Sequence, residues 1–390
     1  MKILIASDTY YPHVNGCSYF TQRLAEALAG RGHEVAVISP GPKFASTIRP
    51  HGNVTHYGVR SFPILIVPHF RFVLPVISGI SGHVARAVRE FEPDIVHIQM
   101  HFPISRMALR GARAAGIPVV ATNHFMPDNL THYLHLSKKI TDGIHSLAWR
   151  DAARTYRKTH GVSAPTRTAG VMLEPWLRES VATISNGIDL ARFNPGNDPA
   201  PAKQKYGLPA KPTLLFVGRL DKEKNVDVVL RALAKTKGTV DIHFAIAGHG
   251  AEGARLKKLA KKLSIENNVT FLGFVPDALL PSLYAAADCF VNAGIAELQC
   301  IVAMEAMATG LPIVGARAVA LPELIHQGEN GFLFEPGNSA ELAERLIEIF
   351  SDAALRERMG KKSLEIISGH DLDTTLETFE AFYRKAIGTA

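Results

Sequence analysis

The segment Ala296-Glu-Leu-Gln-Cys-Ile-Val-Ala-Met-Glu-Ala-Met-Ala-Thr-Gly310 lies between two apolar runs in the second half of the chain. The run before it, Cys-Phe-Val-Asn at 289–292, predicts the end of a buried strand, and the residues after Cys300 predict a short helix. Gly310 ends that helix, and Pro312 begins the next strand. A strand, a helix and a second strand in this order predict a parallel α/β unit.

Two carboxylates stand out in this segment. Glu297 falls on the predicted strand-to-helix loop, and Glu305 falls inside the predicted helix. Eight residues of helix advance by about 12 Å. This spacing suits a ligand that has a ribose at one carboxylate and a sugar at the other, with a diphosphate between them at the helix N-terminus.

The same alternation extends along the whole chain. In the first half, buried strands are predicted at 2–7, 34–39, 94–99 and 118–122, and helices at 22–29, 104–115 and 147–158. The strands of the second series are predicted at 213–217, 242–247, 269–271, 289–291 and 312–314. Two such series predict two doubly wound, Rossmann-like domains, joined by the Pro-, Gly- and Asn-rich stretch 188–202. The ligand site is expected in a cleft between the two sheets, at the carboxyl ends of the strands.

Composition limits the class of protein. The chain has 390 residues, 47% of them hydrophobic, which is more than one core usually holds. No run is long and apolar enough to span a bilayer, and the apolar start is too short for a signal peptide. Cys17, Cys289 and Cys300 have no spacing typical of a metal or disulfide framework. We therefore expect a cytoplasmic protein.

Charge is uneven along the chain. Residues 1–180 hold 20 Lys and Arg against 11 Asp and Glu, whereas the remainder is nearly balanced. The stretch 61–80 is strongly apolar, and 137–167 is rich in cations, which predicts docking on the anionic inner face of a membrane. The alternative is a loop packed on the sheet beside a solvated helix face. No nucleic-acid partner is expected.

Further candidate residues follow the predicted strands. Gly16, after the first strand, permits close approach of a phosphate, although an ordinary turn explains it equally well. Arg219 and Lys224 follow Gly218, and both suit a pyrophosphate. His124, after 118–122, is expected to point into the cleft, with a packed structural histidine as the alternative.

Several chemistries are disfavoured by what the sequence lacks. It contains no P-loop lysine, which argues against an NTPase. The single Asp-x-Asp, at 371–373, immediately precedes a predicted helix and reads as its start. No His or Cys cluster has metal-ligand spacing, so neither a metal nor another cofactor is expected.

Taken together, these motifs resemble the retaining glycosyltransferases of family 4. Gly16, Gly-Arg-Leu-x-x-x-Lys at 218–224, Glu-x7-Glu at 297–305 and the segment 310–336 carry the resemblance. It implies the GT-B fold. Residues 1–190 would form the acceptor-binding domain, 191–370 the nucleotide-sugar-binding domain, and 371–390 a final helix that crosses back to the first.

The resemblance also implies a role for each candidate residue. Arg219 and Lys224, after Gly218, would hold the donor diphosphate, and Gly16 would approach it from the first domain. Glu305 would bind the ribose and Glu297 the donor sugar. The remaining implied contacts are backbone N–H groups of Gln299, Cys300 and Ile301 at the sugar, Val275 and Asp277 at the base, and His124 at the sugar and reaction centre.

The implied activity is transfer of a hexose from a nucleotide-diphosphate sugar, UDP-glucose-type or GDP-mannose, with retention of configuration and without a metal. The charge asymmetry favours a lipid or lipid-linked acceptor, in cell-envelope glycoconjugate synthesis. Alternatives are a small soluble acceptor such as an inositol phosphate, or a GT-B sugar-nucleotide epimerase or binding protein. Cys300 stands where the family often has glycine, so a differently shaped sugar pocket is expected.

Overall fold

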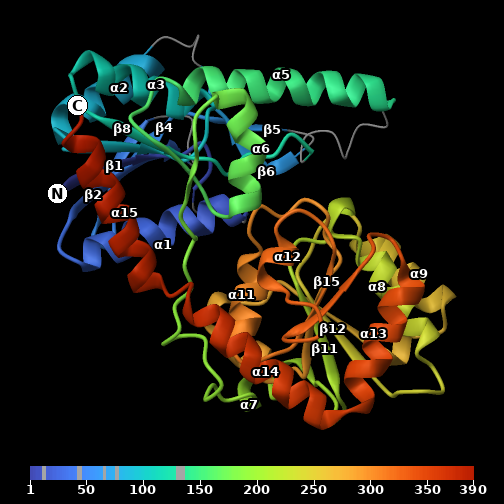
Figure 1. The fold of residues 1–390 in the computed structure, drawn as a ribbon. Coiled ribbons are helices and arrows are strands. Elements are labelled where there is room, and N and C mark those ends of the chain that lie inside the picture. The colour runs from blue at the N-terminus through green and yellow to red at the C-terminus, as the bar shows by residue number, and fades with distance from the viewer. Residues whose placement is uncertain (11–14, 42–45, 65–66, 75–78, 129–136) are drawn as a thin grey trace. The chain divides into compact units, whose positions relative to one another are not determined.

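The structure, a computed structural model, describes residues 1–10, 15–41, 46–64, 67–74, 79–128 and 137–390. The chain divides into two compact α/β domains (Figure 1). The first comprises Met1–Pro127, Leu136–Asn186 and Thr375–Ala390, and the main part of the second is Gly187–Thr374. These divisions lie a few residues from the boundaries expected at 190 and 370.

The first domain is built on an eight-stranded sheet with the order β10-β9-β8-β7-β1-β2-β4-β3. All its pairs are parallel except β3–β4. Central β1 is a continuous apolar run that is buried on both faces, as parallel strands require. The strands are β1 (Lys2–Ala6), β2 (Glu34–Pro40), β3 (Thr47–His51), β4 (Val54–Val59), β7 (Ile95–Ile98), β8 (Val119–Thr122), β9 (Val162–Ala164) and β10 (Ala182–Thr183). β5 (Phe62–Ile64) and β6 (Val67–Phe72) form a separate hairpin.

The helices of the first domain begin at recognisable signals. Asn15 and Ser18 form a capping box at the start of α1 (Gly16–Gly30). The Asp8 carboxylate accepts hydrogen bonds from the backbone N–H of Ile104, at 2.8 Å, and from the Ser105 hydroxyl at the start of α3 (Pro103–Ala114). The other helices are α2 (Ile80–Phe91), α5 (Lys138–Tyr156) and α6 (Arg167–Leu177).

The last helix, α15 (Leu372–Ile387), completes the first domain's core. Phe379 packs against Phe20 and His97, with ring centroids 5.9 and 5.5 Å away. Glu380 pairs with Arg31 at 2.9 Å. A segment from the end of the chain is therefore an integral part of the domain that begins it.

The second domain holds a fully parallel six-stranded sheet with the order β13-β12-β11-β14-β15-β16. From β11 the chain moves outward on one side through β12 and β13, and then returns to β14 beside β11. The direction of winding thus reverses between β11 and β14, which makes their carboxyl ends the switch point. The strands are β11 (Thr213–Val217), β12 (His243–Ala247), β13 (Val269–Gly273), β14 (Cys289–Asn292), β15 (Ile313–Ala316) and β16 (Gly331–Phe334).

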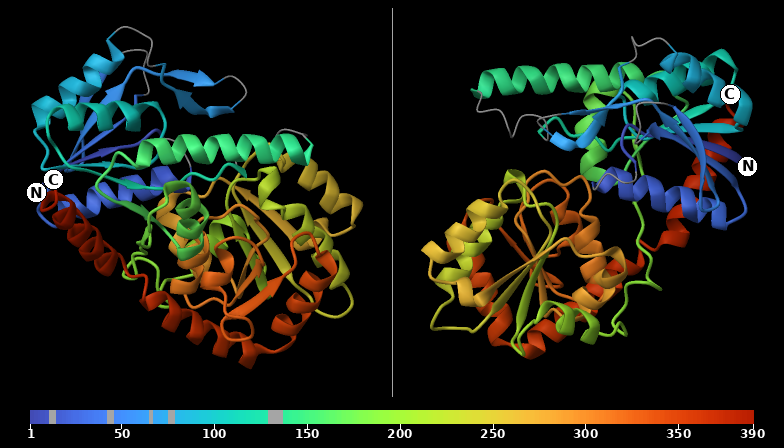
Figure 2. Two further views of the ribbon diagram at one scale, coloured as in Figure 1. Left: turned by 45° about the horizontal axis from the view of Figure 1, so that its top comes forward. Right: turned by 180° about the vertical axis from the view of Figure 1, so that it is seen from behind.

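Helices cover both faces of this sheet (Figures 1 and 2). One face carries α8 (Val226–Lys235), α9 (Gly253–Lys262) and α13 (Ser339–Ser351). The opposite face carries α10 (Leu280–Ala285), α11 (Ile301–Ala308) and α14 (Ala353–Ser368). Short α7 (Ala200–Tyr206) packs on α10, and α12 (Leu321–Leu324) precedes β16. The interior is a continuous apolar cluster, as expected for a domain with its own core.

Most predicted elements are confirmed, and two regions are corrected. The expected strand at 213–217 has the predicted bounds, and the final helix, expected over 371–390, spans Leu372–Ile387. The stretch 40–80, in which no strand was predicted, carries β3, β4, β5 and β6, because β4 pairs with β2 in the parallel sheet and β3 adds outside it. Helix α5 begins at Lys138, not 147, since its first turns are polar and lack the apolar period of a buried helix.

Within the described ranges, no helix combines the length and the apolar character needed to cross a bilayer. Part of the apolar stretch at 61–80, including the side chain of His69, lies outside the described residues.

Close packing of two backbone segments leads to a prediction about Gly248. A Cβ at this position would lie 1.8 Å from the carbonyl oxygen of Gly218, and the residue has φ +131°. Gly248→Ala should lower the free energy of unfolding by roughly 3 kcal/mol or more, because overpacking and backbone strain add. Urea denaturation measures the change. Gly253→Ala, which meets only ordinary contacts, is the control, and equal stability of the two variants would contradict the prediction.

Candidate functional site

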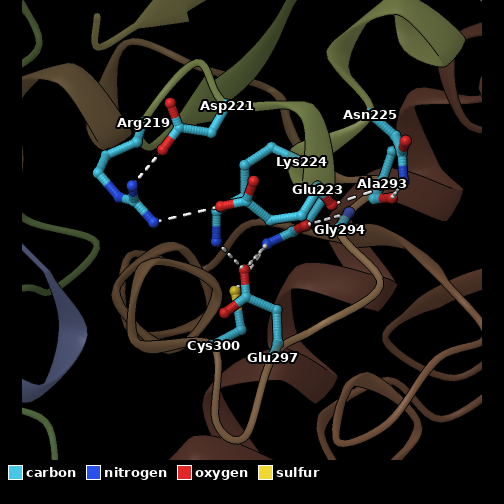
Figure 3. A network of polar contacts seen from close by, with 10 residues as sticks. Arg219, Asp221, Glu223, Lys224, Asn225, Ala293, Gly294, Glu297 and Cys300 are labelled. Atoms are coloured by element: carbon cyan, nitrogen blue, oxygen red, sulfur yellow. Dashed lines mark hydrogen bonds and ion pairs between the residues drawn. The ribbon is translucent and has the colours of Figure 1, made fainter. Parts of the chain in front are cut away.

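The second domain's candidate site is formed by two loops at the switch point, 218–225 after β11 and 293–300 after β14 (Figure 3). The Asn225 side chain donates a hydrogen bond to the carbonyl of Ala293 at 3.2 Å. The backbone N–H of Ile295 donates to the carbonyl of Glu223 at 3.3 Å. These bonds hold the loops together although about 70 residues separate them.

Lys224 and Glu297 form an ion pair between these loops, with Nζ and Oε1 2.5 Å apart (Figure 3). Their side chains are 18% and 14% exposed. Burial on its own would lower the pKa of Lys224, but the charge and hydrogen bond of Glu297 outweigh it and raise the pKa. The ammonium group therefore stays charged at neutral pH. Two residues that the sequence assigned to different parts of a ligand are brought into contact.

Arg219 is held by two carboxylates that the sequence analysis did not single out. Its guanidinium contacts the Asp221 carboxylate, and its Nη2 lies 3.2 Å from Oε1 of Glu223. Glu223 is buried, so its position is set by packing. These contacts fix the orientation of the Arg219 guanidinium group, whose paired N–H donors are suited to phosphate oxygens. Charged residues on a polar loop give no signal in a sequence that they will pair locally.

Asn292, the last residue of β14, is another residue that the sequence analysis did not identify. Its side-chain amide donates to the Cys300 sulfur at 2.8 Å, and its Oδ1 accepts from the backbone N–H of Gly294 at 2.7 Å. Burial, followed by the negative charge of Glu297, raises the pKa of the Cys300 thiol. Cys300 is thus a neutral thiol, buried directly before α11. The available signal in the sequence was an amide side chain at the last position of a predicted strand.

Glu305 lies on α11 and is 3% exposed. Its Oε2 accepts a hydrogen bond from the Tyr284 hydroxyl at 2.8 Å. The carboxylate is therefore oriented by a buried tyrosine from α10, which the sequence did not identify. Ribose binding by Glu305 stays a prediction.

The other donor-side candidates have diverse surroundings. Val275 and Gln299 are buried, and Ile301 begins α11. Asp277 is half exposed and pairs with Arg192, whose Nη2 lies 2.7 Å from its Oδ2. No group of three or more His, Cys, Asp or Glu side chains in the described ranges is arranged to hold a metal ion.

The first domain contributes Gly16, the first residue of α1. A Cβ at Gly16 would meet none of the described atoms within 4 Å. Packing among those residues does not require glycine here, and close approach of a ligand phosphate at Gly16 stays a prediction. Residues 11–14 of the preceding loop lie outside the described residues.

His124 is positioned by a chain of polar side chains inside the first domain. Its Nε2 lies 3.0 Å from Oε1 of Gln99, and Nε2 of Gln99 lies 3.2 Å from Nδ1 of His97. The same nitrogen of His97 accepts from the Tyr383 hydroxyl at 2.8 Å, and His97 Nε2 contacts the Thr122 hydroxyl at 2.7 Å. This pattern places the Nε2 proton of His124 on the hydrogen bond to Gln99.

Burial lowers the pKa of both His124 and His97 to about 3, so both imidazoles are neutral at physiological pH. His124 also packs against Phe20, with ring centroids 4.8 Å apart. His101, which follows the neighbouring strand β7, contacts Phe125 and lies 3.8 Å from Asp151. The structure therefore joins His97 to His124 through Gln99, and His101 belongs to a different set of contacts.

Two family models together match most of the chain. The model described as "Glycosyltransferase Family 4" matches residues 14–192, and "Glycosyl transferases group 1" matches residues 200–365. The chain belongs to glycosyltransferase family 4. It is a hexosyltransferase of this family, and its two parallel-sheet domains are those of the GT-B fold.

Curated relatives of this family 4 glycosyltransferase are about equally distant. A GDP-mannose-dependent alpha-mannosyltransferase of Corynebacterium glutamicum is 28% identical, with 86% of this chain and 77% of the relative covered. An N-acetyl-alpha-D-glucosaminyl L-malate synthase of Bacillus anthracis is 27% identical, with 94% and 92% covered. An alpha-monoglucosyldiacylglycerol synthase of Acholeplasma laidlawii is 28% identical, with 93% and 92% covered.

A solved structure with the same fold is sucrose-phosphate synthase from Thermosynechococcus elongatus. It matches with a TM-score of 0.82 over 100% of both chains, at 18% identity. At this identity the likeness is evidence for the GT-B fold alone.

The buried histidines predict acid sensitivity of the first domain. Burial lowers the pKa of His56 and His101 to about 4, and of His97 and His124 to about 3, from an ordinary value of 6.5. The unfolded chain therefore binds more protons than the folded domain below pH 6.5. Stability should be complete above that pH and should fall toward pH 4, by up to about 1.4 kcal/mol per pH unit for each histidine.

Urea unfolding at pH 7, 6 and 5, followed by tryptophan fluorescence, measures this effect, because Trp149 and Trp176 both lie in the first domain. His97→Gln should flatten the dependence, whereas His326→Gln, in the second domain, should not. An identical slope in the two variants would show that buried histidines are not the cause.

Proposed function

We propose that this glycosyltransferase moves a hexose from a nucleotide-diphosphate sugar to an acceptor hydroxyl with retention of configuration. The observation that carries the proposal is the Lys224–Glu297 pair beside Arg219, at the switch point of the second domain. This is the place where doubly wound sheets bind ligands, and it combines two cations for a diphosphate with a carboxylate for sugar hydroxyls.

In this mechanism the bond between the anomeric carbon and the diphosphate oxygen breaks while the acceptor oxygen attacks from the same face. Negative charge develops on the departing phosphate, where Lys224 and Arg219 stabilise it. That phosphate takes the acceptor's proton. Two fixed cations supply the charge stabilisation, so the proposal assigns no step to a metal.

The carboxylate and histidine have binding roles in this proposal. Glu297, oriented by Lys224 and near Asn292, accepts hydrogen bonds from hydroxyls of the donor sugar. His124, neutral and oriented by Gln99, contacts the sugar from the first domain. A histidine whose pKa is about 3 is a hydrogen-bonding group at pH 7 and not a cation.

Two classes of donor are proposed, UDP-glucose-type sugars and GDP-mannose. The printed names of the relatives specify GDP-mannose for one and a glucosyl product for another. Cys300, where the family often has glycine, is buried with its sulfur bonded to Asn292, and we infer that donor choice is set beside it. A thermal-shift screen of UDP- and GDP-hexoses separates the candidates, because a ligand of the folded state raises the melting temperature.

The proposed acceptor is a lipid or lipid-linked hydroxyl at an anionic membrane surface. On α5, Ile140 and Leu147 are 53% and 66% exposed and lie seven residues apart, so they share one helix face. Lys138, Lys139 and Arg150 are exposed on the same helix. Exposed aliphatic side chains flanked by cations are typical of a helix lying on a membrane. A relative named for a diacylglycerol product supports this acceptor class.

Two of the cations expected for membrane docking have internal roles instead. Arg157 donates to the carbonyl oxygens of Trp176 and Leu177, and Arg167 pairs with Glu174. The second candidate function, transfer to a small soluble acceptor, is favoured by the relative named as a malate synthase. Binding to phosphatidylglycerol vesicles distinguishes a lipid acceptor from a small soluble acceptor.

Lys224→Ala tests the proposed mechanism. With the donor that gives the largest thermal shift, its turnover should fall on the order of 10²-fold, because the developing phosphate charge loses one stabilising cation. Steady-state kinetics measure the loss, and an unchanged melting temperature verifies the fold.

Lys211→Ala is the matched control, because it breaks an exposed pair with Asp241 at the opposite end of β11. Its turnover should be normal. A Lys224→Ala enzyme with near-normal turnover would remove this lysine from the mechanism.

Replacing the exposed aliphatic pair tests the acceptor proposal. Ile140→Glu/Leu147→Glu should abolish co-sedimentation with phosphatidylglycerol vesicles at low salt, because apolar insertion is lost and two negative charges are added. Ile48→Glu/Ile387→Glu changes two exposed aliphatics elsewhere in the same domain and should retain binding. Absence of vesicle binding by the unmodified enzyme at any salt would favour the soluble acceptor.

A further inference from the structure

A hollow on the first domain lies between α3 and α5 and has a volume of about 380 Å³. We call it the α3–α5 hollow. It is lined by eight residues: Arg106, Leu109, Arg110, Arg113, Asp151, Arg154, Thr155 and Lys158. Five of these eight side chains are cationic and one is anionic. Each helix supplies one wall.

Four of the five cations have no acidic partner in the part of the chain that the structure describes. Asp151 pairs with Arg106, whose Nε also donates to the carbonyl of His101. For Arg110, Arg113, Arg154 and Lys158 no ion pair exists among the described residues. The hollow therefore keeps a net positive charge.

Helix stability does not account for this arrangement. Lys158 lies two residues beyond the end of α5, and Arg106 and Arg110 are four residues apart on α3. Like charges at this spacing destabilise a helix. The helix dipole favours Arg113 and Arg154 in the last turns of their helices, but it gives no reason for Arg110 or for cations from two helices to line one hollow.

One end of the hollow is distant from the strand ends that carry His124 and Gln99. Arg113, Arg154 and Lys158 lie in or just beyond the last turns of α3 and α5, next to the points where β8 and β9 begin, whereas Arg106 lies in the first turn of α3. His124 and Gln99 follow the carboxyl ends of β8 and β7, at the opposite edge of the same sheet. An anion held by Arg113, Arg154 and Lys158 would therefore be separate from the substrates proposed above.

The lining specifies the chemistry of the occupant. The arginine guanidinium groups present paired donors that match phosphate oxygens, and lysine adds a point charge. The single apolar lining residue, Leu109, is buried, so little surface is offered to an acyl chain or a ring. The volume is at the lower end of small-molecule sites, which suits an anion with more than one phosphate group.

We propose that the α3–α5 hollow binds an anion that carries two or more phosphate-type charges. The same chemistry is offered by a free diphosphate compound and by the headgroup phosphates of an anionic lipid. The proposal does not depend on the donor or acceptor proposed above, because no residue of the hollow belongs to either.

Calorimetry with inorganic pyrophosphate tests the free anion. The titration is done on Lys224→Ala protein, because the donor site is itself expected to bind pyrophosphate. Adding Arg154→Gln/Lys158→Gln should weaken the remaining binding about tenfold or more, since two charged hydrogen-bond donors are lost. Arg110→Gln/Arg113→Gln, from the other wall, should have a similar effect.

Lys258→Gln/Lys262→Gln is the matched control. These exposed lysines of α9 have the same four-residue spacing, lie in the second domain and have no ion-pair partner in the described ranges. The control should leave the pyrophosphate affinity unchanged. Tryptophan fluorescence verifies that each hollow variant keeps a folded first domain.

Phosphatidylglycerol vesicles provide the lipid arm, with phosphatidylcholine vesicles for comparison. Weaker pyrophosphate binding in the hollow variants assigns the site to a free anion. An effect on phosphatidylglycerol binding alone assigns it to lipid headgroups. If the hollow variants match the Lys258→Gln/Lys262→Gln control with both probes, the proposal is wrong.

Discussion

The ion pair between Lys224 and Glu297 is the interaction on which the second domain's candidate site depends. It joins the loops that follow β11 and β14, two neighbouring strands at which the winding of the sheet reverses. Both partners are largely buried, so each charge relies on the other for the stabilisation that water would otherwise provide. Asn225, which bonds across the same two loops, keeps the pair at a fixed place. The cation and the carboxylate are thereby held ready for a ligand with a diphosphate and hydroxyl groups.

The two domains of this enzyme prepare their polar groups differently. In the second domain charges dominate, and Asp221, Glu223 and Glu297 hold Arg219 and Lys224. In the first domain, neutral groups linked through Gln99 orient His124. Tyr383 joins this set from α15, so the end of the chain takes part in ordering a candidate residue near its first third. Neutral, buried hydrogen-bond networks rigidify a site without a charge that has to be desolvated.

Sequence reasoning located the site in the second domain because glycines, cations and carboxylates fall directly after apolar strands. Glu297, Arg219 and Lys224 were identified in this way, and the structure brings them to one place. Asp221, Glu223, Asn292 and Tyr284 were missed, since each acts through a partner that is distant in sequence or hidden in a common polar loop. The strands within 40–80 were missed as well, because β3 is an edge strand, β5 and β6 form a separate hairpin, and β4 lacks the continuous apolar run of a buried parallel strand.

The alternation of apolar runs with helical periods was sufficient to establish two doubly wound domains, since burial on both faces of a parallel sheet demands that pattern. The order of residue types after each strand was sufficient for the family. Which charged side chains come together was decided only by the tertiary structure. Lys224 meets Glu297 because β14 returns beside β11, and four arginines and one lysine gather in one hollow because α3 and α5 both line it. Contacts of this kind depend on strand order and helix packing, which a linear pattern of residue types does not contain.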